Sequence, residues 1–450
     1  MSTTPDMNPV IDGIVGRKLP GFISTASFIA IIVGVVSFLF GLFALGDGGA
    51  YAWGAFLVGL VYTLAIAQGG VMFSVLMTGT WARWGRPVKR IAESFGFFLP
   101  VGWILLLVFL LFGLKIYAWN PNTILSIGPA DLTPHSPEAI ASKKIWLSST
   151  FFVLRQLILM LILIGLDGLY LYASLKPDLV MAKQRLGSKA PDWWGQLTGG
   201  ATNVETTLKE SLQTQSFLVP FIAVAYALVF SFMAFDLIMS LSPWWFSNMF
   251  GGWTFMSSFW LALATIGMVS MLGLDWLGLR RWITPEVTHD IGKLMLAGCM
   301  FWAYTAYAQI LPIWYTDMPE ETDFLLIRMR LPEWSWLAQL VGITCFIAPF
   351  TILLSRGIKK MRWPFVGICG LIMVGLFFER SLLVLPSIWF EDPRSWDTAV
   401  VSVGVWLGFV GLFTQVVGQA LCRIPPLAIT DPYLEPHPWD VHVHSLDHRH

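Results

Sequence analysis

Long apolar runs separated by short polar segments are the main pattern of this 450-residue chain. Ten of the runs have about 20 or more residues, the length that an α-helix needs to cross the hydrocarbon core of a bilayer. The pattern therefore predicts an all-α integral membrane protein with ten transmembrane helices. The predicted helices cover residues 22–45, 51–78, 94–117, 145–172, 217–241, 250–277, 289–314, 332–355, 363–386 and 398–421.

Little of the chain lies outside these helices. We expect a cytoplasmic N-terminal segment at 1–21, a membrane domain at 22–421 and a His-rich cytoplasmic tail at 422–450. The longest interruption inside the membrane domain, at 176–216, has mixed charge and contains prolines and paired glycines. Such a segment predicts a cytoplasmic loop with a short surface helix rather than a separate domain.

Composition and charge agree with a membrane protein and orient it. Hydrophobic residues make up 56% of the chain and charged residues only 12%, which excludes a water-soluble fold of this length. More than half of the 28 Lys and Arg residues follow the second, fourth, sixth and eighth predicted helices. By the positive-inside rule, both termini are then cytoplasmic. A net charge of zero without a basic domain argues against nucleic acid as a partner.

Ligands for redox cofactors are missing from the predicted helices. The cysteines are Cys299, Cys345, Cys369 and Cys422, and none is part of a CxxC motif. Only His289 touches a predicted span, so no pair of histidines can hold a haem inside the membrane. The sequence predicts a chain with no metal and no redox cofactor of its own.

Ionisable and polar residues inside the spans are the candidates for function, because such groups are costly in a membrane unless they line a pathway or form ion pairs. They fall into two groups, one in the cytoplasmic half and one in the periplasmic half of the spans. The cytoplasmic group, predicted to carry protons, is Gln68, Asp167, Asp275, His289, Asp290 and Lys293. The periplasmic group, predicted to carry protons or to form a buried ion network, is Arg155, Asp236, Glu379 and Arg380. An equally good interpretation is that three of these residues are helix-end carboxylates at the membrane interface. They are Asp167, Asp236 and Asp275.

Glu379 needs a positive partner at this depth, and Arg155 and Arg380 are the candidates. Consecutive residues of a helix point about 100° apart. We therefore expect either Glu379 or Arg380 to face a neighbouring helix. If that neighbour is the fourth predicted helix, which carries Arg155, the contact would join the two halves of the protein.

The stretch 284–322 places a charged entrance on a membrane helix, with Thr284 as its predicted cap and Pro285 in its first turn. Its segments HDIGKLM, FWAYTAYAQ and IWYTDMPEET, together with SLSPWWFSNMFGGW upstream and DPYLEP near the C-terminus, resemble the F subunits of bacterial alternative complex III. These complexes are quinol:electron acceptor oxidoreductases of the bacterial cytoplasmic membrane. Their F subunits are similar to the NrfD-like family of polysulfide reductase membrane subunits.

The resemblance implies two four-helix bundles, formed by helices two to five and six to nine, with two flanking helices. It also implies a non-catalytic subunit that supports the complex. The two polar groups of residues offer a candidate proton route through this subunit. Haem c and iron-sulfur clusters would belong to partner subunits, and quinol to the related C subunit. Further partners would be small membrane subunits, lipids and a cytochrome c or terminal oxidase. The histidine-rich segment 437–450 departs from the family pattern.

Two other functions remain open at this point. Ten spans with buried charges also suit a secondary transporter, although no matching pair of broken helices is visible. The third interpretation is a purely structural membrane anchor. Two interpretations are open for the segment 240–250. It is either part of an aromatic belt at the membrane interface or a lid on the periplasmic side.

Overall fold

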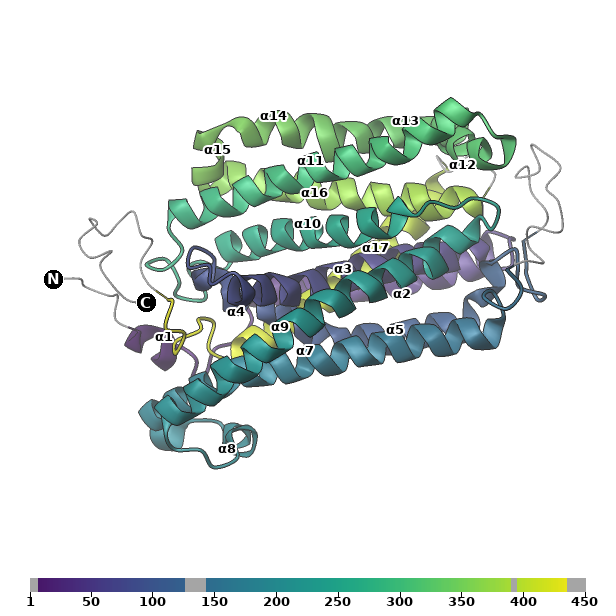
Figure 1. Ribbon diagram of the computed structural model, residues 1–450. Coiled ribbons are helices and arrows are strands. Elements are labelled where there is room, and N and C mark those ends of the chain that lie inside the picture. Colours follow the sequence, from purple (N-terminus) through teal and green to yellow (C-terminus); the bar gives the residue numbers. More distant parts are fainter. Residues whose placement is uncertain (1–6, 126–142, 390–394, 435–450) are drawn as a thin grey trace.

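The computed structural model describes residues 7–125, 143–389 and 395–434, and this part of the chain contains helices and no strand (Figure 1). Ten helical segments are long and apolar enough to cross a membrane, as predicted. The chain is therefore a multi-pass membrane protein. The spans are α2 (Gly21–Ala44), α3 (Ala50–Gly79), α4 and α5 in one segment (Arg86–Ser94 and Leu99–Phe112), α7 (Ser149–Leu186), α9 (Val204–Met233), α10 (Met249–Leu272), α11 (Pro285–Thr316), α13 and α14 in one segment (Pro332–Gly342 and Ala348–Leu354), α16 (Arg362–Val384) and α17 (Trp396–Arg423).

The spans form two four-helix bundles side by side, as expected. The first bundle contains α3, the α4–α5 segment, α7 and α9, and the second contains α10, α11, the α13–α14 segment and α16. Helices α2 and α17 pack on each other and flank the bundles. In the described residues, four short α-helices connect the spans or precede them: α1 (Asn8–Asp12), α8 (Asp192–Thr198), α12 (Pro319–Met329) and α15 (Arg356–Lys360).

Small residues allow the central helices to approach closely. Helix α3 is almost completely buried and packs against α10 of the other bundle. A Cβ atom on Gly69 would lie only 2.5 Å from the Cβ of Ala262, so glycine is required at this crossing. Gly34 of α2 and Gly408 of α17 meet in the same way, with 2.4 Å between an added Cβ on Gly34 and the Cα of Gly408. Such contacts are the usual basis of helix association in membranes.

Both ends of the described chain lie on the same side of the bundles. Asp12 of α1 pairs with Arg185 at the end of α7, and the C-terminal segment 424–434 contacts the same end of the first bundle, where its Thr430 bonds to Asp178. We call this side the termini end and the opposite side the far end. The positive-inside rule predicts that the termini end is cytoplasmic.

Three boundaries differ from the prediction. The third span begins at Arg86, eight residues early, because the charged α4 is buried inside the bundle. The predicted loop 176–216 is largely helical, since α7 continues through Pro177 to Leu186 and α9 begins at Val204. The tail does not begin at 422, because Leu427 and Ile429 are buried against the bundle. The histidines of 437–450 lie outside the described residues.

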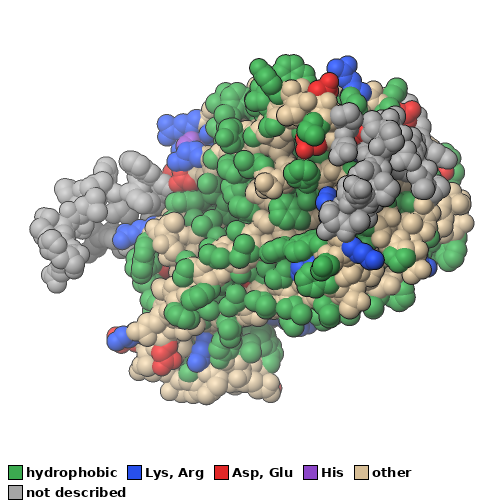
Figure 2. All heavy atoms as spheres, turned by 45° about the vertical axis from the view of Figure 1, so that its right-hand side comes forward, with side chains coloured by type: hydrophobic (Ala, Val, Ile, Leu, Met, Phe, Trp, Pro, Cys, Tyr) green, Lys and Arg blue, Asp and Glu red, His purple; other side chains and the backbone are tan. Residues whose placement is uncertain are grey.

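The outer surface fits a bilayer. Figure 2 shows hydrophobic side chains across most of one face, with most charged side chains towards the ends of the molecule. Large apolar side chains such as Ile32, Leu161 and Phe221 are more than half exposed. In a membrane these side chains would contact lipid, so their exposure carries no cost.

Candidate functional site

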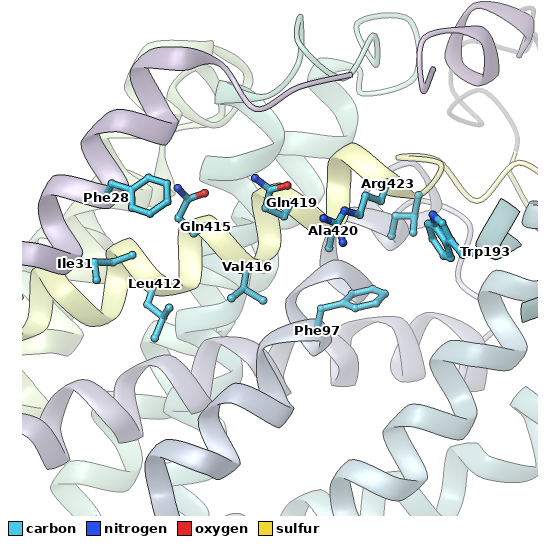
Figure 3. Close-up of a pocket in the computed structure, with 11 residues that line it drawn as sticks. Phe28, Ile31, Phe97, Trp193, Leu412, Gln415, Val416, Gln419, Ala420 and Arg423 are labelled. Carbon is cyan, nitrogen blue, oxygen red and sulfur yellow. The ribbon is translucent and has the colours of Figure 1, made fainter. Parts of the chain in front are cut away.

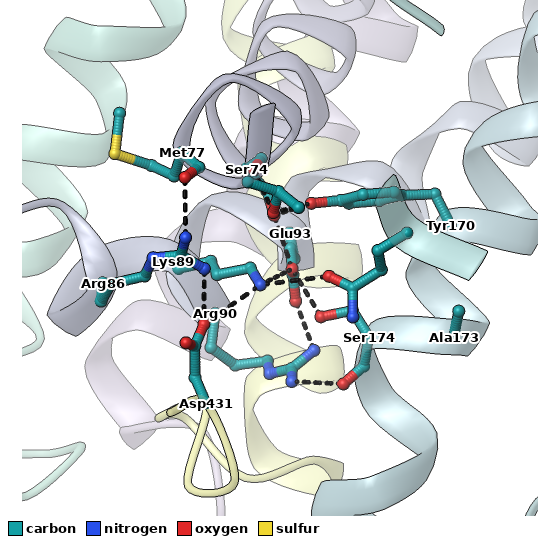
Figure 4. Close-up of polar contacts among 12 residues, drawn as sticks. Ser74, Met77, Arg86, Lys89, Arg90, Glu93, Tyr170, Ala173, Ser174 and Asp431 are labelled. Carbon is teal, nitrogen blue, oxygen red and sulfur yellow. Dashed lines mark hydrogen bonds and ion pairs between the residues drawn. The ribbon is translucent and has the colours of Figure 1, made fainter. Parts of the chain in front are cut away.

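A network of charged side chains is buried at the termini end of the first bundle (Figure 4). It contains three cations and three carboxylates, and each of these side chains is at most 4% exposed. The members are Arg86, Lys89 and Arg90 of α4, Glu93 of α4, Asp178 of α7 and Asp431 of the C-terminal segment. Because the charges balance, the network as a whole is neutral.

Arg90 is the centre of the network. Its Nη1 donates to Glu93, and its Nη2 lies 2.5 Å from Asp178 Oδ2 and 3.1 Å from the carbonyl oxygen of Ser174. The spacing of three and four residues places Arg86, Arg90 and Glu93 close together on α4. One guanidinium thus joins two helices, α4 and α7, through two carboxylates.

Asp431 attaches the C-terminal segment to the same network. Its Oδ2 lies 2.7 Å from Arg86 Nη1 and 3.3 Å from Lys89 Nζ. Burial raises the pKa of the Asp431 carboxyl, but the ammonium of Lys89 and the guanidinium of Arg86 outweigh burial and hold this pKa below its ordinary value. The carboxyl is therefore ionised at neutral pH, and the segment closes the termini end of the bundle.

Hydroxyl groups extend the network towards the middle of the bundle. Glu93 Oε1 accepts hydrogen bonds from Ser74 of α3 at 2.6 Å and from Ser174 of α7 at 2.7 Å. The hydroxyl of Tyr170 lies 2.9 Å from Ser74 Oγ and 2.8 Å from Thr78 Oγ1. Hydroxyl groups both donate and accept hydrogen bonds, so this chain of contacts is suited to passing a proton.

Gln68 and Asp167 lie further inward. Gln68 is on α3, six residues or about 9 Å from Ser74 along the helix, and Asp167 is on α7, about one turn from Tyr170. Both side chains are at most 1% exposed. Their side chains face each other. Within the described part of the chain, however, the two carboxylate oxygens of Asp167 and the amide nitrogen and oxygen of Gln68 have no hydrogen-bond partner of good geometry. Such unsatisfied buried groups are rare and indicate a place for water or a transferred proton.

One face of α7 connects these groups. Residues at spacings of three and four along this helix are all buried: Gln156, Met160, Leu163, Asp167, Tyr170, Ser174 and Asp178. They extend over about 33 Å, close to the thickness of a hydrocarbon core. Two apolar residues, Met160 and Leu163, separate Gln156 from the polar residues that begin at Asp167. This face of α7 is therefore polar at both ends and apolar in the middle.

At the far end, Gln156 belongs to a second ionic group around Asp236. Arg155 binds Asp236 with two hydrogen bonds, of 2.8 and 2.9 Å, and Gln156 donates to the same carboxylate. Trp146 donates to it at 3.0 Å, and the Trp146 ring lies 3.9 Å from the Arg155 guanidinium carbon. Asp236 is in a short π-helical stretch, Ala234–Ile238, at the end of α9; such bulges are frequent at functional sites.

Glu379 and Arg380 form a separate pair in the second bundle. The guanidinium of Arg380 donates to Glu379 and, at 2.7 Å, to Ser257 of α10. Trp302 of α11 donates to Glu379 at 3.1 Å. We expected one of the two residues to face a neighbouring helix, and Arg380 reaches α10. The suggested contact between Glu379 and Arg155 does not form, because Arg155 is bound to Asp236 in the other bundle.

The remaining predicted residues lie elsewhere. Asp275 is half-exposed and bonds to Arg280 and Arg362, while Lys293 pairs with Asp290 at 2.5 Å beside His289. These four predicted residues, Asp275, His289, Asp290 and Lys293, are at the surface of the second bundle. The predicted cytoplasmic group is therefore divided, since only Gln68 and Asp167 reach the interior of the first bundle.

Sequence reasoning missed most of the buried network. The charge pattern predicts that Arg86, Lys89 and Arg90 are loop cations that orient the protein, and it gives Glu93 no role. The signal that would have identified them is a periodic pattern of charge in RPVKRIAES directly before an apolar run, which continues the helix outward. Asp431 lies in the DPYLEP segment, where nothing in the hydropathy pattern indicates burial.

A groove of about 660 Å³ lies between α2, α8, α17 and Phe97, which is in the short turn before α5 (Figure 3). Its walls are mostly apolar, and Arg423 of α17 lies beside Trp193 at one end. Phe28 is 58% exposed and Phe97 is 41% exposed, so the groove faces the outside of the protein. It is separate from the buried face of α7 and is not part of the candidate path.

The charge of Glu379 can be removed with little change in shape. Glu379→Gln leaves Arg380 buried without its carboxylate, and we expect this to lower the free energy of unfolding by about 3–5 kcal/mol. Thermal melting of the purified chain in detergent measures the effect. Glu286→Gln is the matched control, because its partner Lys360 is partly exposed and such pairs contribute about 0–1 kcal/mol. Equal melting temperatures for the two variants would contradict a structural role of the buried pair.

Comparison with protein-family models and with curated proteins finds no match to this chain.

Proposed function

We propose that this chain is a cofactor-free membrane subunit of a respiratory quinol:cytochrome c or quinol:oxidase oxidoreductase in the bacterial cytoplasmic membrane, and that its first bundle carries protons. The resemblance of its sequence motifs to alternative complex III subunits supports the first part. The second part rests mainly on one observation: Asp167 and Gln68 are buried facing each other between two polar groups, and neither makes a hydrogen bond of good geometry with a described residue.

The buried face of α7 supports a proton route with an entrance at each end. From the termini end, a proton would pass from Glu93 through Ser74 and Tyr170 to Asp167. From the far end, it would enter through Asp236, whose carboxylate is held by Arg155 and Gln156. Met160 and Leu163 would prevent uncontrolled leakage between the two halves, because apolar side chains hold no continuous chain of water. Transfer across this gap would require a conformational change that the partner subunit drives.

Purification from native membranes tests membership of a complex. The chain, tagged and isolated in mild detergent, is expected to bring with it haem-bearing partners and quinol-oxidising activity. After the partners are removed, the chain itself is expected to show no stoichiometric haem absorbance. A colourless, homogeneous preparation with no activity would contradict the proposal and favour a transporter.

A further inference from the structure

A cavity of about 590 Å³ lies at the far end of the second bundle, outside the candidate proton path. Its walls come from α10, α11, α13 and α16, with α12 across its end. Among the predicted residues of the proton path and the ion networks, Glu379 alone lines this cavity. The volume is typical of sites for small organic molecules.

Aromatic rings dominate the polar end of this cavity. Trp245, from the segment 240–250, stacks on Phe324 of α12 with ring centroids 3.8 Å apart and planes 4° from parallel. Trp253 of α10 and Trp302 of α11 are 5.9 Å apart on the adjacent wall. These rings provide large apolar faces for a ligand, and two of them also carry unused hydrogen-bond donors.

Those donors are the ring N–H groups of Trp245 and Trp253. Both nitrogens are buried, and neither has a hydrogen-bond partner in the part of the chain that the structure describes. An unsatisfied buried donor is unfavourable, because it has lost its hydrogen bond to water without gaining another. A bound molecule with an acceptor at this end of the cavity would remove that cost.

Arg328 of α12 adds a positive charge to the same cavity. The side chain is 4% exposed, and its hydrogen bonds go to the carbonyl oxygens of Phe324, Leu382 and Leu383 and to Ser387. No carboxylate pairs with it among the described residues. Burial lowers the pKa of the guanidinium, but arginine stays protonated at neutral pH. Four of its five N–H donors are used, so one remains for a ligand.

The cavity also reaches the surface that faces the bilayer. Tyr307, Met329 and Ile347 line it, and these side chains are 60%, 48% and 55% exposed. An apolar molecule dissolved in the membrane would meet this opening without crossing water. The entrance is thus apolar and the inner end carries hydrogen-bond donors and a cation.

We infer that the cavity binds a membrane-soluble amphiphile whose head group accepts hydrogen bonds, with the head at Trp253 and Arg328 and the apolar body towards Tyr307 and Ile347. Carbonyl oxygens of a quinone and the carboxylate of a fatty acid both provide this head group. The inference does not depend on the proposed respiratory function, because a transporter or an anchor with the same cavity would bind the same class of molecule.

Photo-crosslinking of the full-length chain in lipid nanodiscs tests this site. The probes are an azido-quinone and a diazirine-bearing fatty acid, and mass spectrometry locates the labelled residues. We expect labelling of peptides from α11 and α12 that contain cavity residues. Ala306→Trp, which fills the cavity, should lower labelling at least tenfold. Ala308→Trp is the matched control, because Ala308 is on the same helix and does not line the cavity.

Trp253→Phe provides an independent variant that removes one N–H donor and little volume. We expect severalfold weaker labelling with this variant and an unchanged elution profile. Cavity labelling by only one probe identifies the source of the head group, and labelling by both supports the shared chemistry. No labelling of cavity residues by either probe, or equal labelling of the Ala306→Trp and Ala308→Trp variants, would overturn the inference.

Discussion

Asp167→Asn is expected to abolish proton transfer through this subunit while the complex still assembles and oxidises quinol. Asparagine has nearly the same shape as aspartate, but it cannot bind and release a proton near neutral pH. Asp167 carries no ion pair with any described residue, so the change leaves no opposite charge there without a partner. In liposomes containing the purified complex, a pH-sensitive dye should report at least a tenfold loss of proton movement attributable to this path.

Two variants control this experiment. Asp275→Asn changes a carboxylate from the same predicted group, but Asp275 is half-exposed and paired with Arg280 and Arg362; it should leave proton movement unchanged. Asp167→Glu keeps a titratable group at the site and should retain part of the activity. If Asp167→Asn retains the full number of protons per electron, Asp167 is only a buried polar residue and the proposed path is wrong.

The positions of the spans were predictable because they depend on local composition. A run of about 20 apolar residues has few alternatives to crossing a membrane, and the structure places a helix at each predicted run. The error at the third span has a physical reason. Arg86 and Lys89 look like loop cations when only charge is considered, but they are buried because Asp431, 345 and 342 residues away, compensates them.

The candidate site was less predictable because depth along a helix does not determine neighbours. Arg155 and Asp236 are both predicted on the periplasmic side, and they do form a pair. Asp167 and Asp275 are both predicted on the cytoplasmic side, yet they lie in different bundles. Helix contacts depend on which faces carry small residues, such as Gly69 against Ala262, and this information is weak in a single sequence. The chain of hydroxyl groups between Glu93 and Tyr170 follows only from the packing.

The buried network leads to the largest expected effect on stability. Arg90→Gln removes the guanidinium that binds both Glu93 and Asp178, and leaves two carboxylates in the bundle with less positive charge. Removing one member of a buried ion pair typically costs about 3–5 kcal/mol, and here two contacts are lost together. We expect a strongly lowered melting temperature and a low yield of folded chain in detergent.

Arg280→Gln is the matched control for this effect. It makes the same chemical change at an arginine whose side chain is 70% exposed and whose partner Asp275 is also exposed, where a pair contributes about 0–1 kcal/mol. A double variant, Arg90→Gln with Glu93→Gln, removes one charge of each sign and should recover part of the lost stability, since the network becomes neutral again. If Arg90→Gln melts like Arg280→Gln, water must reach the network and solvate its charges. The termini end of the first bundle would then be an open, hydrated entrance, and the buried ion pairs would not close it.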